Sequence, residues 1–447
     1  MNTGVVTLLL IVAAVLVVAG LAHPSSRRFV LPALLVVWIG LLRCWWWLKF
    51  RCTFAGVCRE GGLSKRRTKR VVRRGKGEES IEKWADPKLR RVSTSPYGVT
   101  LKVRTRKGQR LEQLEDFAPE LAASYSADSI RTFPPKRRAG STVMFELIMR
   151  DLIKKPATAQ MPAPTLEKIG HCDLGRRQSG KRWNLQVIER QTLVVGASGA
   201  GKGSVMWGVI CSLAPGIALD AVRLWGGDLK GGLELGMAER LFHRTAYTGP
   251  DAVAMVDELL EVAEARTEEM RGESRSFKPG PGKPLHVLVI DELASLTAYS
   301  DKDTQKSIDP RLKRLLSIGR AVGVVVIAFI QDPRKEVVDA RGLFTQVIAL
   351  RLRSRGEVVM VLDETVANKA QAHRISISAQ GTGYVIDEDG SVDRVRADYW
   401  PDSLLKHVGM LYPAGSGWRN LSAVPTADAP TESPTIALEA AEIDGAA

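Results

Sequence analysis

The chain has 447 residues, enough for two or three domains, and carries a formal net charge of +15 at pH 7. A positive surplus of this size favours an anionic partner, either nucleic acid or a membrane surface. The five cysteines include no CxxC pair and no His/Cys set with zinc spacing, which excludes a zinc site, and we interpret the thiols as reduced.

Two apolar runs lie at the N-terminal end of the chain. Gly4 to Ala22 is free of charged residues, and a second run extends from Phe29 to about Leu48, interrupted by Arg43. Runs of this length are typical of transmembrane helices, and Trp45–Trp47 suit an interfacial belt. Because a short loop joins the runs, residues 1–50 are predicted to form a two-helix membrane hairpin. The alternative is that both runs are buried core helices.

The residues after the second run are strongly basic. Between Lys49 and Lys76 there are eleven Lys or Arg and a single acid, Glu60. By the positive-inside rule this segment stays in the cytoplasm, so we expect a multi-pass protein of the cell membrane whose C-terminal bulk is cytoplasmic. Residues 51–76 are assigned as a basic juxtamembrane segment that contacts lipid, DNA or both.

Residues 77–163 show mixed periodicities. The stretches "GVTLKVRT" and "STVMFELIM" are typical of strands, whereas "RLEQLEDFAPELAASY" has apolar residues at helical spacing, with Pro119 marking a start or a break. No residue in this region is placed for chemistry. We therefore expect a small α+β domain that acts as a spacer or assembly module.

A glycine-rich stretch, "GASGAGKGS", follows an apolar strand at Thr192–Val195 and precedes a helix. Glycines let backbone N–H groups turn inward around phosphates, and the helix N-terminus adds its dipole. Lys202 is predicted to reach the β- and γ-phosphates, whereas the alternative is a turn that only packs strand against helix. The predicted ATP site comprises Gly196, Ala197, Ser198, Gly199, Ala200, Gly201, Lys202, Gly203 and Ser204.

Polar residues end two further apolar strands. The strand Leu285–Ile290 in "LHVLVIDELASL" runs into Asp291 and Glu292, and "GVVVIAFIQDP" runs into Gln331. We expect Asp291 to hold Mg²⁺ through water and Glu292 to act as the general base that polarises the attacking water. Gln331 is a candidate sensor of the γ-phosphate. Binding alone would not need the second acid, so the pair indicates hydrolysis.

Five motifs occur in a fixed order: "GASGAGKGS", "GGDLKGGLEL", "VLVIDELASL", "RLLSIGRAVGVVVIAFIQDP" and "GTGYVIDEDG". In this order they resemble the FtsK/SpoIIIE-like DNA translocases, and within them the actinobacterial proteins of conjugative plasmids and integrative elements. The resemblance implies an α/β fold, with a RecA-like P-loop ATPase motor over residues 164–408. It also implies a homo-oligomer, a hexameric ring, that uses ATP and Mg²⁺ to pump double-stranded DNA at a membrane.

The same resemblance implies two residues that act between subunits. Arg320, in "GRAVG", matches the position of an arginine finger that enters the neighbour's site and neutralises charge on the transferring phosphoryl group. Arg355, in "RLRSR", falls where a second basic residue contacts the neighbouring nucleotide. The alternative is that both belong to a basic surface.

Two features depart from the family pattern. Gly203 stands where the hydroxyl residue is usual, so either Ser204 supplies a hydroxyl to Mg²⁺ or water fills that position. Residues 409–447 are rich in acidic residues toward their end and are predicted to form a disordered tail. The family's C-terminal winged-helix module does not fit in this tail. We therefore expect contacts to DNA phosphate with little base readout, and a separate protein that supplies DNA specificity.

The sequence favours a membrane-anchored, ATP-driven translocase of double-stranded DNA that transfers a plasmid or integrative element between cells. The alternatives are a chromosome-segregation pump, a protein-export ATPase of the same fold branch, and a nucleotide-gated scaffold with a dead site. Glu292 argues against the dead site, and the single motor argues against the export ATPase, whose relatives often carry several motors in tandem.

Overall fold

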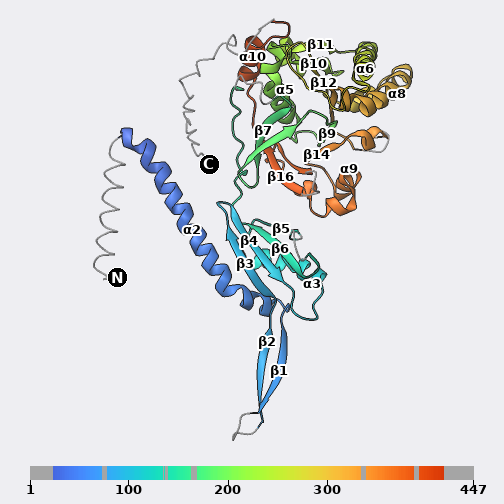
Figure 1. The fold of residues 1–447 in the computed structure, drawn as a ribbon. Coiled ribbons are helices and arrows are strands. Elements are labelled where there is room, and N and C mark those ends of the chain that lie inside the picture. Colours follow the sequence, from blue (N-terminus) through green and yellow to red (C-terminus); the bar gives the residue numbers. More distant parts are fainter. Residues whose placement is uncertain are drawn as a thin grey trace, which may run out of the picture. The chain divides into compact units, whose positions relative to one another are not determined.

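In a computed structural model of the protein, the described residues are 24–72, 78–133, 135, 139–162, 169–333, 339–386 and 392–416. They divide into two compact units (Figure 1). The first comprises Met1–Lys154 with Gln178–Gly180, and the second comprises Lys155–Arg177 and Lys181–Ala447. Each unit has a hydrophobic core of its own.

The first unit contains a four-stranded antiparallel sheet in the order β3-β4-β6-β5. Strand β4 buries Val99, Leu101 and Val103 on one face, the alternation expected of a half-buried strand. Its elements are α2 (Pro24–Glu60), β1 (Lys65–Val72), β2 (Glu78–Ala85), β3 (Lys88–Thr94), β4 (Gly98–Arg104), α3 (Leu111–Glu115), α4 (Ala118–Tyr125), β5 (Ser129–Phe133), η1 (Ala139–Ser141) and β6 (Thr142–Ile148). Pro119 lies in the first turn of α4, so it marks a start.

Helix α2 packs one face against this sheet. Trp46, Phe50, Phe54 and Cys58, spaced four residues apart, are buried in the core of the first unit. Trp46 is 3% exposed, whereas Trp45 is 54% exposed. The expected interfacial belt is therefore divided, because the 100° turn between successive helical residues places Trp46 in the protein core and its neighbours outside it.

No helix among the residues that the structure describes combines the length and the apolar character needed to cross a membrane. The first apolar run, residues 4–22, lies outside the described residues. The second run belongs to α2, whose side chains are described from Val36 onward. The membrane hairpin stays a prediction.

The basic segment is part of a β-hairpin. Strand β1, "KRRTKRVV", pairs antiparallel with β2, "EESIEKWA", with Lys65 opposite Ala85 and Val72 opposite Glu78. The segment assigned to residues 51–76 thus contributes the last turns of α2 and one strand. Its pairing partner comes from the region assigned to the next domain.

The second unit is built on a ten-stranded sheet in the order β11-β10-β12-β13-β9-β14-β15-β16-β7-β8. The six strands from β11 to β14 are parallel, and the remaining ladders are antiparallel. The strands are β7 (His171–Arg177), β8 (Arg182–Gln186), β9 (Thr192–Val195), β10 (Val222–Gly227), β11 (Phe242–Ala246), β12 (Leu285–Ile290), β13 (Val324–Ile330), β14 (Gln346–Leu350), β15 (Thr382–Ile386) and β16 (Val392–Ala397).

Helices cover both faces of the parallel part. Residues of β13 alternate between two cores, with Val325, Ile327 and Phe329 in one and the intervening residues in the other. Strands buried on both faces read as continuous apolar runs, which is why β9, β12 and β13 were recognisable in the sequence. The helices are α5 (Lys202–Ala218), η2 (Leu235–Leu241), α6 (Gly249–Met270), α7 (Leu293–Thr297), α8 (Lys302–Ile318), η3 (Gly319–Val322), η5 (Asp339–Leu343), α9 (Arg355–Ala367), η6 (Ala372–Arg374) and α10 (Asp402–Leu411).

The architecture agrees with the expected α/β class and a P-loop ATPase motor. The boundary expected after residue 408 falls inside α10, because Leu405, Val408 and Tyr412 pack into the core of the second unit. Most of the predicted tail, residues 417–447, lies outside the described residues.

Candidate nucleotide site

The predicted phosphate loop joins the end of β9 to the start of α5. The Gly196 N–H donates to the Ile330 carbonyl (3.0 Å) and the Ala197 N–H to the Arg351 carbonyl (2.9 Å), which ties the loop to the strands on either side of β9. Gly201 caps α5 at φ +92°, and a Cβ there would lie 2.2 Å from the Gly381 nitrogen. Only glycine fits at this position, which lies at the start of a helix, where backbone N–H groups are suited to bind an anion.

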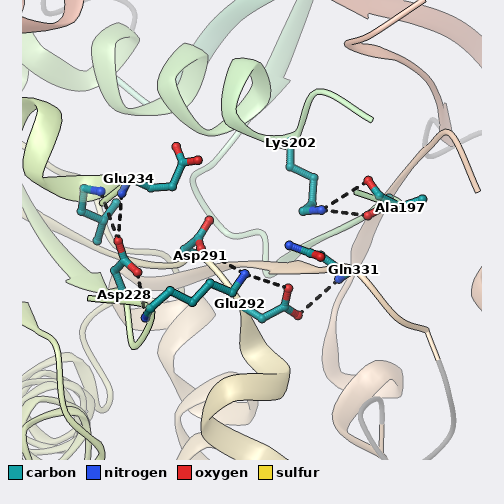
Figure 2. A network of polar contacts seen from close by, with 10 residues as sticks. Ala197, Lys202, Asp228, Glu234, Asp291, Glu292 and Gln331 are labelled. Atoms are coloured by element: carbon teal, nitrogen blue, oxygen red, sulfur yellow. Dashed lines mark hydrogen bonds and ion pairs between the residues drawn. The ribbon is translucent and has the colours of Figure 1, made fainter. Parts of the chain in front are cut away.

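Lys202 is folded back onto this loop. Its Nζ donates to the carbonyl oxygens of Gly196 (2.9 Å) and Ala197 (3.5 Å), as Figure 2 shows. Burial lowers the pKa of Lys202 to about 8, although the nearby carboxylate of Glu292 opposes the shift. A phosphate would give this ammonium a better partner than the two carbonyls, because a charge-assisted hydrogen bond is the stronger one.

The acids after β12 face the loop. Asp291 and Glu292 are 9% and 6% exposed. The Gln331 backbone N–H donates to Glu292 Oε1 (3.2 Å), which fixes the carboxylate, and Figure 2 shows Gln331 between Lys202 and Glu292. Parallel strands deliver these residues to one edge of the sheet, the edge at which open α/β sheets bind ligands. The structure thus brings together the loop, Lys202, Asp291, Glu292 and Gln331.

A lysine that the sequence analysis did not select bridges the two acids. Lys230 Nζ lies 3.3 Å from Glu292 Oε2 and 3.6 Å from Asp291 Oδ2. Its backbone is fixed by Asp228, 1% exposed, whose carboxylate accepts the N–H groups of Lys230 (3.1 Å), Glu234 (3.1 Å) and Leu235 (3.4 Å). Asp228 follows β10 beside β12, so the strand-end rule that found Asp291 could have found it.

Four carboxylates therefore lie at this edge of the sheet: Asp228, Glu234, Asp291 and Glu292. Burial raises the pKa of Asp291 while Lys230 lowers it, and burial together with the charge of Asp291 raises the pKa of Glu234. Among the described residues no group of His, Cys, Asp or Glu could hold a metal by itself. Mg²⁺ commonly binds through one or two carboxylates plus substrate phosphates, and Asp291 fits that arrangement.

Gly203 and Ser204 lie in the first turn of α5. A Cβ built on Gly203 would lie 3.7 Å from Glu234 Oε2, an ordinary contact, so a serine fits at this position. Successive side chains of a helix point about 100° apart. The Ser204 side chain therefore points in a different direction from a side chain placed at position 203. A hydroxyl at Ser204 would act on a metal in the loop most simply through a bound water.

Arg320 and Arg355 do not contact this site. Arg320 is exposed on η3, before β13, whereas Gln331 follows that strand. Seven residues at about 3.3 Å each separate the two by roughly 20 Å. Arg355 is exposed at the start of α9, where it pairs with Glu364 and donates to Asn368 Oδ1 (2.8 Å). Neither reaches the phosphate loop of its own chain.

Arg351, which the sequence analysis missed, does reach it. Its Nη2 donates to the Ser198 carbonyl (2.7 Å), and its Nε is buried without a hydrogen-bond partner among the residues that the structure covers. Arg351 directly follows β14, the parallel neighbour of β9. Its position directly after an apolar strand is the sequence signal that could have identified Arg351. The two other arginines of "RLRSR" made this position hard to single out.

Comparisons with a family model and with known protein sequences indicate the same family. The FtsK/SpoIIIE family model matches residues 155–381. Transfer protein TraSA of Streptomyces ambofaciens is 24% identical over 343 residues, covering 70% of this chain and 79% of that protein. DNA translocase FtsK of Staphylococcus epidermidis is 22% identical over 293 residues, covering 60% of this chain but only 36% of that protein.

Two solved structures resemble the fold. The pCW3 conjugation coupling protein TcpA, in a monomer form with ATPgS, has a TM-score of 0.48 and 18% identity, covering 73% of this chain and 93% of that one. The cytoplasmic domain of the type VII secretion ATPase EccC of Thermomonospora curvata has a TM-score of 0.46 and 20% identity, covering 62% of this chain and 35% of that one.

Proposed function

The chain belongs to the FtsK/SpoIIIE family, and on that premise we propose that it is a membrane-anchored ATPase that translocates double-stranded DNA, in the transfer of a plasmid or integrative element between cells. The observation that carries the ATPase is the placement of Glu292 and Asp291 opposite Lys202 on one edge of the sheet. The similarity to a transfer protein supports conjugative transfer as the setting.

Each site residue has a role in this proposal. Lys202 and the N–H groups of the loop would bind the phosphates, and Asp291 would hold Mg²⁺. Glu292 accepts a proton from the attacking water, and Gln331 senses the γ-phosphate beside it. Mg²⁺ bound with the nucleotide would supply charge neutralisation on the phosphates.

Lys230 is part of the same cycle. While Lys230 Nζ pairs with Glu292 Oε2, at 3.3 Å, the ammonium occupies the carboxylate oxygen that would face the attacking water. Nucleotide brings phosphate oxygens that compete for the Lys230 ammonium. Release of Glu292 from Lys230 would then couple nucleotide binding to activation of the base.

Other features support the wider assembly. On α2 the side chains of Val36, Trp38 and Leu41 are each more than half exposed, which suits a surface that lipid covers. The distance of Arg320 from its own site suits a ring in which each subunit completes its neighbour's site, and six subunits is the number that the family implies. The net charge of +15 suits a DNA partner bound through phosphate.

DNA should stimulate ATP hydrolysis by the full-length protein. We expect random-sequence duplex DNA to raise the steady-state rate several-fold, since the duplex promotes the assemblies in which neighbouring subunits complete each site. The measurement is phosphate release with and without DNA, and Lys202→Ala serves as the inactive control. Stimulation by unfolded polypeptide but not by DNA would contradict the proposal and favour a protein-export ATPase.

The shifted serine gives a separate expectation. If Ser204 holds a water on Mg²⁺, Ser204→Ala should reduce Mg²⁺-dependent turnover by on the order of 10-fold, the scale of outer-sphere substitutions at metal sites. The double variant Gly203→Ser/Ser204→Ala should recover turnover, because a serine fits beside Glu234 at position 203.

Titration of the ATPase rate with Mg²⁺ measures both effects. Ser212→Ala, later on the same helix and half-buried, is the matched control and should behave as the wild type, because its hydroxyl donates only a long hydrogen bond to the Asp173 carbonyl (3.4 Å). An unchanged Ser204→Ala would instead mean that water bound by other groups fills this position.

A further inference from the structure

The first unit holds a basic groove of about 910 Å³ that no role has yet been given. It lies where the later turns of α2 meet the base of the β1–β2 hairpin, strand β3 and the end of β4. Seven of its lining residues are cations. They are Arg51 from α2, Arg67 from β1, Lys88 and Arg90 from β3, Arg104 from β4, and Arg106 with Lys107 from the turn after it.

The charge of this groove is not compensated within the described part of the chain. Its one lining carboxylate, Asp86, pairs with Arg59 at 2.7 Å, and no described carboxylate forms an ion pair with any of the seven cations. Arg67 and Arg106 are held in place through the carbonyls of Lys107 (3.3 Å) and Leu63 (3.2 Å). Carbonyl contacts fix the guanidinium groups without neutralising them, so the groove keeps its positive charge.

A neutral donor adds to this arrangement. Gln109 lines the groove, and its Oε1 accepts the Arg106 backbone N–H at 3.0 Å, which fixes the amide orientation. Its Nε2 is buried and has no hydrogen-bond partner among the residues described. Buried donors are rarely left without a partner, so Gln109 is a second and independent sign that a ligand with acceptor oxygens belongs here.

We propose that this groove binds the sugar–phosphate backbone of duplex DNA, as a contact separate from the motor. A single phosphate pairs with one or two cations. This groove has seven, from four segments of the chain, which is more than one phosphate can use. Duplex DNA carries one negative charge for about every 1.7 Å of its axis, which matches such a distributed set. The choice of DNA among polyanions rests on the proposed function.

The position on α2 favours DNA over a lipid headgroup. The exposed apolar side chains of α2 lie before Lys49, whereas the groove is lined by Arg51 and Phe54, and Phe54 is packed into the protein core. The groove therefore meets α2 next to Phe54, where the helix packs into the protein core, and after the last of its exposed apolar side chains.

The test compares two pairs of substitutions in the full-length protein. Arg90→Gln/Arg104→Gln removes two groove cations for which the structure shows no hydrogen bond or ion pair. Arg91→Gln/Arg110→Gln removes two cations of the same unit outside the groove, and serves as the matched control. The probe is a fluorescent random-sequence duplex without nucleotide, titrated by anisotropy at several salt concentrations.

We expect weaker binding by the groove variant, and a fall of about 1.8 in the slope of log K against log salt, from roughly 0.9 for each lost phosphate contact. The control variant should retain the wild-type slope. The rate of ATP hydrolysis without DNA should match the wild type in both variants, because the motor lies in the other unit. Thermal unfolding that matches the wild type shows that the substituted unit is folded.

Equal affinities and slopes for the two variants would overturn the inference and leave the proposed function standing. Loss of binding to vesicles of phosphatidylglycerol and phosphatidylcholine, with DNA binding intact, would also overturn it and assign the groove to lipid. A wild-type protein that neither binds duplex DNA nor responds to it would refute the proposed function itself.

Discussion

Glu292→Gln should stop ATP turnover while leaving ATP binding intact. We expect the rate to fall by about 10²- to 10⁴-fold, the usual contribution of a general base. The glutamine oxygen can still accept the Gln331 N–H that Glu292 accepts at 3.2 Å, so the site keeps its shape. Lys202 and Asp291, which in the proposed mechanism would hold the phosphates and Mg²⁺, are unchanged. The loss should therefore appear in kcat and not in nucleotide affinity.

Two measurements separate these quantities. Single-turnover hydrolysis reports the chemical step, and equilibrium binding of a fluorescent ATP analogue reports affinity. Glu273→Gln is the control, because Glu273 is an exposed carboxylate in the turn after α6. Hydrolysis by Glu292→Gln at the wild-type rate would show that the base is elsewhere. A parallel loss of nucleotide affinity would show that Glu292 supports the fold of the site.

The motor could be predicted in good part from the sequence. Strands β9, β12 and β13 are apolar throughout because both faces are buried, and such runs are readable without knowledge of their neighbours. Since parallel strands end at one edge of the sheet, the residues that follow them could be expected to meet. Asp291 and Gln331 do lie at the same edge of the sheet. Their placement could be predicted because the argument requires only the direction of the two strands.

Lys230 and Arg351 illustrate what the sequence did not provide. Lys230 reaches the acids only because Asp228 accepts three backbone N–H groups and folds the turn toward β12. Arg351 reaches the loop because β14 lies beside β9, a pairing between strands far apart in sequence. Both placements depend on tertiary contacts that local periodicity does not encode.

The first unit shows a different limit. The hydropathy of an apolar helix is the same whether lipid or protein covers it. The four-residue spacing of Trp46, Phe50 and Phe54 indicates the covered face, but the sequence analysis did not use it. The basic groove could not be predicted from a run of charge. Only Arg67 of "KRRTKRVVRRGK" lines it, and the other cations come from three separate segments.

Arg320→Ala should abolish hydrolysis in assemblies without preventing ATP binding by a monomer. Removal of an arginine finger typically costs about 10³- to 10⁵-fold in rate. Arg320 lies at the far end of β13 from Gln331, too far away to serve the site of its own subunit. Arg314→Ala is the control, because Arg314 is an exposed arginine of the preceding helix whose surface pair with Glu264 contributes little.

Mixing two inactive proteins tests the action across subunits directly. Lys202→Ala subunits cannot bind the phosphates but carry an intact Arg320, and Arg320→Ala subunits have the complementary defect. In an equal and random mixture about a quarter of the subunit boundaries join an intact Lys202 to a neighbour's intact Arg320, because a ring boundary is directional. Partial ATPase activity should therefore return on mixing, in proportion to those boundaries. If mixtures shown to co-assemble recover no activity, Arg320 does not act in trans, and its exposed position on η3 must serve another contact.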